Sequence, residues 1–317
     1  MYNFEYLLTV KNNIRLPPFT GHLLRAAVLK LISNNFPSLA ENLHKDNELR
    51  PYSLSPLRSF RGKFLRTKSR GEIELTAGAK VKFRLGLLTT DIAEQILRIN
   101  LQEEKLTITL AKGEFQIESI KMTKLAPERL LKESAHRSNK FQLSFLTPTY
   151  LAIKKCPFPM RFPDPRYLYS NLANIWNSTL GEKVKVDHDA LREWVNENVS
   201  ITGYNLKTRT QYISKGAMKI GFTGWVNYQL NPKNTDENNY AAWIHALSKF
   251  AEFSNVGGGR TAGFGCVQYY PKRQLETEPS ADLTEEGPQA SSDVNNRIFK
   301  NNLKITNLRE ERNGLFS

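Results

Sequence analysis

The chain has 317 residues, a hydrophobic content of 40% and a formal net charge of +14 at pH 7. Because a single domain usually has about 100–150 residues, we expect two domains. No run of about 18 apolar residues is present, and Cys156 and Cys266 have neither a CxxC partner nor a histidine cluster, which argues against a transmembrane helix, a disulfide framework and a metal site.

The positive charge is concentrated before residue 275. Residues 275–317 contain eight acidic and five basic residues, a net charge of −3, so residues 1–274 carry +17. Such a surplus attracts polyanions, and nucleic acid is the partner it favours. The alternative to a nucleic-acid-binding protein is a basic protein that has no polyanionic ligand.

The first half predicts the order strand, helix, strand, strand, helix, strand. Residues 2–10 alternate as a strand, so we expect no signal peptide and a cytoplasmic protein. A helix is expected over 21–34, followed by a short helix that ends at His44 and a strand-like segment over 50–59 that prolines interrupt. A strand is expected over 80–88, a helix over 91–101 and a hairpin of 105–110 with 114–124. This is the order of the ferredoxin-like unit.

Residues 58–70 (RSFRGKFLRTKSR) contain six basic residues and no acidic residue. Three of them recur with a period of two, which places them on one face of a strand. The segment predicts contacts with a phosphate backbone, with Phe60 and Phe64 as base-stacking partners. A solvated hairpin whose charges prevent aggregation is the alternative. The expected RNA-binding residues here are Arg58, Arg61, Lys63, Arg66, Lys68 and Arg70.

The second half repeats this order after an expected linker at 126–139. Strands are expected over 141–145, 201–213, 219–230 and 266–270, and helices over 167–180, 188–197 and 237–253, where His245 falls opposite the apolar stripe. We therefore predict an α+β protein with two tandem ferredoxin-like (RRM-like) βαββαβ domains, residues 1–125 and 138–274. The acidic segment 275–317 is expected to be a disordered tail.

The segment 255–270 (NVGGGRTAGFGCVQYY) contains five glycines and lies between the last predicted helix and strand. Gly257, Gly259 and Ala262 have dinucleotide-binding spacing, but that motif requires a strand before it and a helix after it. A Walker loop is excluded because no Lys-Ser/Thr pair follows the last glycine.

Residues 262–269 (AGFGCVQY) match the core string of the RNA-recognition motif at its glycines and two of its aromatics. Backbone without Cβ atoms can approach a phosphate closely, so we predict an RNA-binding loop with Arg260 on a phosphate and Phe264 on a base. A glycine-rich turn that only joins helix to strand is the alternative. The residues expected to contact RNA are Gly257, Gly258, Gly259, Arg260 and Phe264.

Five strings together resemble one family: LHKDNELRPYSLSPL, FLTPTY, LYSNLANIWN after a proline-rich run, KIGFTGWVNYQL and FSNVGGGRTAGFGCVQYY. In order and spacing they resemble the CRISPR-associated endoribonucleases of the RAMP superfamily, which cut precursor CRISPR RNA within its repeats. The resemblance implies two ferredoxin-like domains and binding of repeat RNA, both as precursor and as mature guide RNA. It also implies cleavage without metal or cofactor, in which the 2′-hydroxyl attacks the adjacent phosphate to give a 2′,3′-cyclic phosphate and a 5′-hydroxyl.

The same resemblance places the catalytic histidine at His44, as general base or acid, with Arg50 stabilising the charge of the phosphate. Some family members also carry a tyrosine on the first helix. This chain has no such tyrosine, because residues 20–43 contain none. His22 is therefore a candidate for the second proton carrier, although both histidines also suit helix ends without catalytic roles. The alternative function is a non-catalytic RAMP subunit that binds guide RNA within a CRISPR effector complex.

Overall fold

The computed structural model describes residues 1–44, 49–65, 71–102, 106–135, 137–153, 156–180, 184–214, 217–232, 236 and 238–271. Met1–Gln274 form one compact unit. The predicted tail, residues 275–317, lies outside the described residues. None of the helices in the described part is long and apolar enough to span a membrane.

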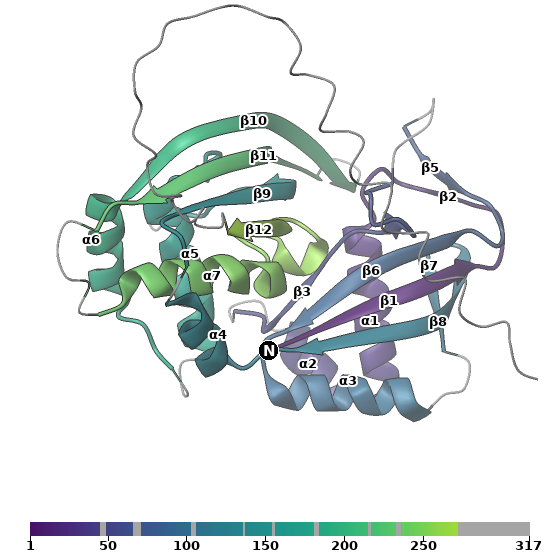
Figure 1. Ribbon diagram of the computed structural model, residues 1–317. Helices are drawn as coiled ribbons and strands as arrows, with labels where there is room; N and C mark the ends of the chain where they lie inside the picture. The colour runs from purple at the N-terminus through teal and green to yellow at the C-terminus, as the bar shows by residue number, and fades with distance from the viewer. Residues whose placement is uncertain are drawn as a thin grey trace, which may run out of the picture. The chain divides into compact units, whose positions relative to one another are not determined.

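The first half builds an antiparallel sheet in the order β3-β6-β1-β8-β7, with β4 paired to β6 (Figure 1). Helix α1 buries Leu24, Ala27, Val28 and Ile32, the i, i+3, i+4 and i+8 positions of one helix face, so this face packs into the core. The strands are β1 Tyr2–Val10, β3 Tyr52–Leu54, β4 Arg58–Ser59, β6 Lys80–Leu87, β7 Thr107–Leu110 and β8 Gly113–Lys124; β2 Ile14–Leu16 and β5 Ile73–Leu75 pair separately, and the helices are α1 Gly21–Asn35, α2 Pro37–His44 and α3 Thr90–Gln102.

The second half builds a four-stranded antiparallel sheet in the order β10-β11-β9-β12. Its elements are β9 Lys140–Thr149, α5 Pro165–Leu180, α6 His188–Asn198, β10 Val199–Ser214, β11 Ala217–Leu230, α7 Tyr240–Ser254, a short 3-10 helix η1 Arg260–Ala262 and β12 Val267–Pro271. In β3-β6-β1-β8 and in β10-β11-β9-β12, the strands of each βαββαβ unit follow the order second, third, first, fourth. The predicted fold class of two ferredoxin-like units is confirmed.

The segment predicted as a linker contains a helix, α4 Pro127–Ser134. Its residue Leu130 is 4% exposed and belongs to the hydrophobic core of the second ferredoxin-like half. The segment is therefore packed against the fold rather than extended between two domains. The domain limits at residues 125 and 138 stay predictions.

His245 is buried, whereas the sequence pattern predicted a side chain on the exposed face of its helix. It is 2% exposed, its Nδ1 lies 2.8 Å from the Tyr269 hydroxyl, and its ring packs edge-on against Phe141 at 5.0 Å. The prediction was wrong because α7 packs on several sides, against β12, α5 and α4, and 11 of its 15 residues are buried.

This burial makes the stability of the fold sensitive to acid. Burial, reinforced by the positive charge of Arg137, lowers the pKa of His245 to about 4. An unfolded histidine titrates near 6.5, so between these values the unfolded chain binds a proton that the folded chain does not. We expect the free energy of unfolding to fall by about 2 kcal/mol between pH 7 and pH 5 on account of this residue.

Urea unfolding at the two pH values checks this prediction. The variant His245→Gln should lose about 2 kcal/mol of the pH dependence, whereas His188→Gln, at the partly exposed start of α6, serves as the matched control. An unchanged pH dependence in the His245→Gln variant would contradict the assignment.

Candidate functional site

The glycine loop, residues 255–266, is held inside the protein by its own backbone amides. Gly258 N donates to Tyr150 O at 3.0 Å, Gly265 N donates to Pro148 O at 3.1 Å, and Gly257 N donates to the Asn171 side chain at 2.8 Å. At Gly265, φ is +67° and a Cβ atom would lie 1.8 Å from the carbonyl oxygen of Val256. The glycines are thus required for close packing of the backbone on itself, and these three amides are not available to a phosphate.

Arg260 and Phe264 do not have the surroundings that their predicted roles require. Arg260 is 7% exposed, and its guanidinium donates to the carbonyl oxygens of Ser254 at 2.8 Å and Arg50 at 2.9 Å. Burial lowers the pKa of Arg260 to about 10. Phe264 is 1% exposed and packs against Phe19 at 4.7 Å. Both predictions are corrected: Arg260 binds backbone carbonyls instead of phosphate, and Phe264 is a core residue unable to stack on a base.

Asn255 joins the glycine loop to the first sheet. Its Nδ2 lies 2.8 Å from Leu54 O in β3, and within 3.1 Å of the carbonyl oxygens of Arg260 and Phe264 in the loop. Its Oδ1 accepts a hydrogen bond from Arg84 in β6. One side chain therefore fixes the shape of the loop and its position against β3 and β6.

The segment that contains Arg50 lies between the end of α2 and the glycine loop. Arg50 Nε donates to Leu43 O at 3.2 Å, and Arg50 O accepts from Arg260. His44 is the last residue of α2, so its backbone lies next to this contact; its side chain is outside the described residues. His44 and Arg50, two of the three residues that the sequence proposed for catalysis, thus belong to neighbouring stretches of backbone.

Tyr52 follows in β3 and is surrounded by positive charge. It is 2% exposed and lies close to Arg25, Arg50 and Thr261. Burial raises the pKa of Tyr52, while the positive charges of Arg25 and Arg50 oppose that rise. The phenol is therefore protonated at neutral pH and has two guanidinium groups nearby.

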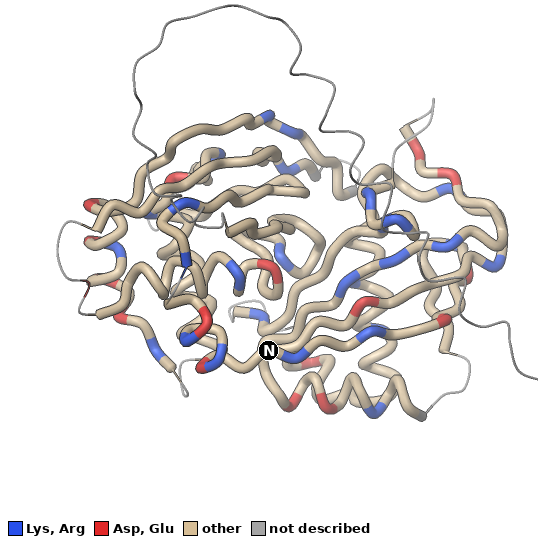
Figure 2. Tube along the Cα trace, viewed as in Figure 1, with Lys and Arg blue, Asp and Glu red and all other residues tan. Residues whose placement is uncertain are grey.

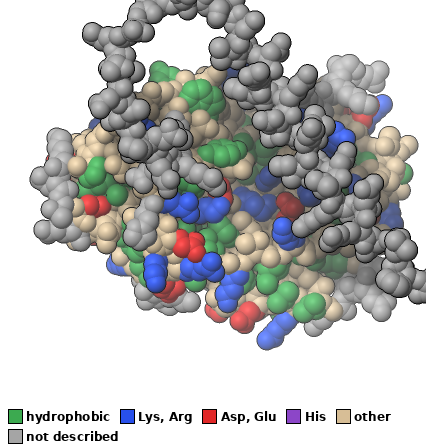
Figure 3. Space-filling model, in the orientation of Figure 1, with side chains coloured by type: hydrophobic (Ala, Val, Ile, Leu, Met, Phe, Trp, Pro, Cys, Tyr) green, Lys and Arg blue, Asp and Glu red, His purple; other side chains and the backbone are tan. Residues whose placement is uncertain are grey.

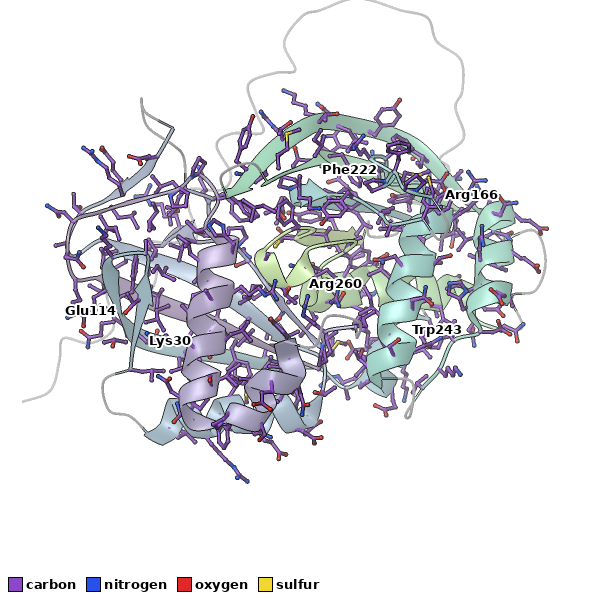
Figure 4. The ribbon with its side chains drawn as sticks, turned by 180° about the vertical axis from the view of Figure 1, so that it is seen from behind. Lys30, Glu114, Arg166, Phe222, Trp243 and Arg260 are labelled. Carbon is purple, nitrogen blue, oxygen red and sulfur yellow. The ribbon has the colours of Figure 1, made fainter. Side chains whose placement is uncertain are left out.

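Helix α1 supplies the other side of this cluster. It packs against both β3 and η1, and a Cβ atom at Gly21 would lie 2.0 Å from Ala262 O (Figure 4 labels Arg260, the first residue of η1). His22 and Arg25, three residues apart, lie on the same side of α1. Burial lowers the pKa of His22, and its Nδ1 is buried without a hydrogen-bond partner among the described residues. The cluster of Arg25, Arg50 and Tyr52 is called the junction cluster below.

Arg25 was missed by the sequence analysis. A single arginine in an amphipathic helix has no motif, and its proximity to Tyr52 depends on the packing of α1 against β3. The available signal was its spacing of three residues from His22, which predicts a shared helix face.

The basic segment forms a hairpin as far as the structure describes it. Arg58 is partly buried with its guanidinium 5.2 Å from the ring centroid of Phe64, whereas Arg61 and Lys63 are exposed in the turn. Phe60 is 55% exposed, with Lys82 of β6 5.1 Å from its ring centroid. Figure 3 shows basic side chains gathered near the middle of the face that it draws. Arg66, Lys68 and Arg70 lie outside the described residues.

Two family models match the chain in succession. Residues 2–124 match the Cas6 N-terminal domain, and residues 143–267 match the CRISPR-associated endoribonuclease Cas6. The chain belongs to the Cas6 family. The N-terminal match, residues 2–124, contains the junction cluster, and the second match, residues 143–267, contains the glycine loop.

Curated relatives and solved structures of the Cas6 family are similar to this chain. The CRISPR-associated endoribonuclease Cas6 of Mycobacterium tuberculosis is 29% identical over 136 residues, which span 42% of this chain and 40% of the relative. A Cas6 product complex has a TM-score of 0.68 at 22% identity and covers 85% of this chain and 100% of the other. Thermus thermophilus Cas6 has a TM-score of 0.58 at 21% identity, with 86% of this chain and 98% of the other covered. The likeness to these structures establishes the fold.

Proposed function

We propose that the chain is a metal-independent endoribonuclease that cleaves precursor CRISPR RNA within its repeats. The observation that carries the proposal is the position of Arg50, hydrogen-bonded to the last turn of α2 on one side and to Arg260 of the glycine loop on the other. This arrangement keeps a guanidinium-bearing segment beside the backbone of His44. Membership of a family described as endoribonucleases supports the proposal further.

The proposed reaction is an attack of the ribose 2′-hydroxyl on the adjacent phosphate. One histidine accepts the 2′-hydroxyl proton, and a second group gives a proton to the departing 5′-oxygen, so the products are a 2′,3′-cyclic phosphate and a 5′-hydroxyl. His44 is proposed for one of these roles. His22 suits the role of base, because burial lowers its pKa and thereby favours the neutral imidazole at pH 7.

Charge on the phosphorane requires fixed positive groups nearby. Arg50 and Arg25 are proposed for this role. The positive charges of both lower the pKa of Tyr52, so both guanidinium groups lie close to the same phenol. The exposed Arg61 and Lys63 of the basic hairpin are proposed to bind the RNA backbone outside this centre.

A cleavage assay tests the function. The full chain is incubated in excess EDTA with RNA that carries a repeat from the CRISPR array of the encoding organism, and with a scrambled RNA of the same composition. We expect one cut in the repeat, none in the scrambled RNA, and a cyclic phosphate at the new end. Binding of the repeat without any cut would instead favour the non-catalytic RAMP subunit, and cleavage only with added Mg²⁺ would reject the proposed mechanism.

A further inference from the structure

The second sheet has one face that the helices of the described part of the chain do not cover. Every second residue along the strands of this sheet faces the core. Examples are Leu143, Val226 and Tyr269, which are buried together with residues of α5 and α7. The intervening residues of the strands form two rows across the sheet. The first row consists of the successive register partners Asn205, Trp225, Ser144 and Gln268, and the second consists of Asn227, Gln142 and Tyr270. None of these seven residues is buried. We call this surface the open face.

The strands of this sheet contain basic residues and no acidic ones. Strands β9, β10, β11 and β12 include Lys140, Lys207, Arg209 and Lys219 but no Asp or Glu. Register places Lys207 opposite Thr223, two residues from Trp225, and Lys140 opposite Gln229, two residues from Asn227, so both lie on the open face. Figure 2 marks the basic residues along these strands in blue. Within the described part of the chain, none of these four bases forms an ion pair. Their charge is available to a polyanion.

Two aromatic rings lie on the same surface. Trp225 is 37% exposed and Tyr270 is 43% exposed. Trp225 lies beside a strand glycine: a Cβ atom at Gly203 would be 3.9 Å from the indole and 3.5 Å from the side-chain nitrogen of Asn227. Asn227 accepts a hydrogen bond from Gln142 at 3.0 Å, which orders the amides between the rings. The aromatic rings can stack on nucleobases, and the amides can form hydrogen bonds with the edges of nucleobases. The basic side chains, without acidic neighbours in these strands, can contact phosphates.

We propose that the open face binds a single-stranded stretch of RNA, with bases stacked on Trp225 and Tyr270 and phosphates at Lys207 and Arg209. The chemistry is that of a single-stranded polynucleotide, because stacking requires bases that are not paired with a second strand. That this strand flanks the cleaved repeat rests on the proposed function. The open face uses none of the residues proposed for catalysis, so it holds RNA and does not cut it.

Binding of a fluorescein-labelled oligouridylate of about ten nucleotides, which lacks a repeat, tests the inference. By fluorescence anisotropy, Trp225→Ala should bind about 10-fold more weakly than the wild type, and Trp225→Phe should retain most of the affinity because an aromatic ring remains. The double variant Lys207→Ser/Arg209→Ser should lower the slope of log affinity against log salt by about 1.4, from the loss of two phosphate contacts.

The matched control is Lys30→Ser/Arg98→Ser, which removes the same charge from exposed positions of α1 and α3. The inference is overturned if Trp225→Ala, folded by circular dichroism, binds like the wild type, or if the control pair lowers the salt slope as much as the open-face pair. These outcomes are separate from the proposed function. A chain that cuts no repeat but binds oligouridylate through Trp225 would reject the endoribonuclease and keep the open face.

Discussion

Replacement of His44 by alanine should slow cleavage of the cognate repeat RNA by at least about 100-fold and leave binding nearly unchanged. The expected factor is the lower range for the loss of one proton-transfer group. Binding should persist because the basic hairpin and the open face do not involve His44. Rates are measured under single-turnover conditions in EDTA, and affinity is measured with the same RNA.

The matched control is His188→Ala, which removes a histidine at the start of α6, in the second unit. Equal cleavage rates for His44→Ala and the wild type would remove His44 from the proposed centre. Loss of binding in parallel with cleavage would show instead that the residue acts through RNA affinity or folding.

Replacement of Gly265 by alanine should destabilise the fold by at least about 3 kcal/mol. The new Cβ would lie 1.8 Å from the carbonyl oxygen of Val256, so the loop backbone would have to move. Such movement would strain the contacts of Asn255 with Leu54, and with them the connection between the glycine loop and β3.

Gly62→Ala is the control, because Gly62 also has a positive φ, +83°, but nothing lies within 4 Å of its Cβ position. It should cost only about 1 kcal/mol, the ordinary cost of a left-handed alanine. Both variants are compared by urea unfolding. Equal losses would show that backbone conformation, and not close packing, is what the glycine at 265 provides.

The fold followed from local sequence patterns to a large extent. Residues 2–10 alternate along one strand, and residues 219–230 do so along another, and both strands formed close to their expected limits. Successive hairpins and crossover helices then allow few antiparallel topologies, and the ferredoxin-like order is one of them. The expected order of elements was therefore enough to predict both sheets.

The candidate site could be predicted only in part, because it depends on contacts between distant segments. The glycines of residues 255–265 indicated close backbone approach correctly, but the sequence does not show whether the neighbouring group is a ligand or the protein itself. Phe264 meets Phe19, and Arg260 meets Arg50, across more than 200 residues of chain. A contact at that separation leaves no periodic signal, and for the same reason Arg25 was not recognised.

The central claim is that the ribose 2′-hydroxyl is the nucleophile. The most direct test repeats the EDTA cleavage assay with a repeat RNA that carries a single 2′-deoxynucleotide on the 5′ side of the cut phosphate. We expect this RNA to be bound as tightly as the unmodified repeat and not to be cut at that position. Cleavage of the deoxy RNA at the same phosphate would contradict the claim.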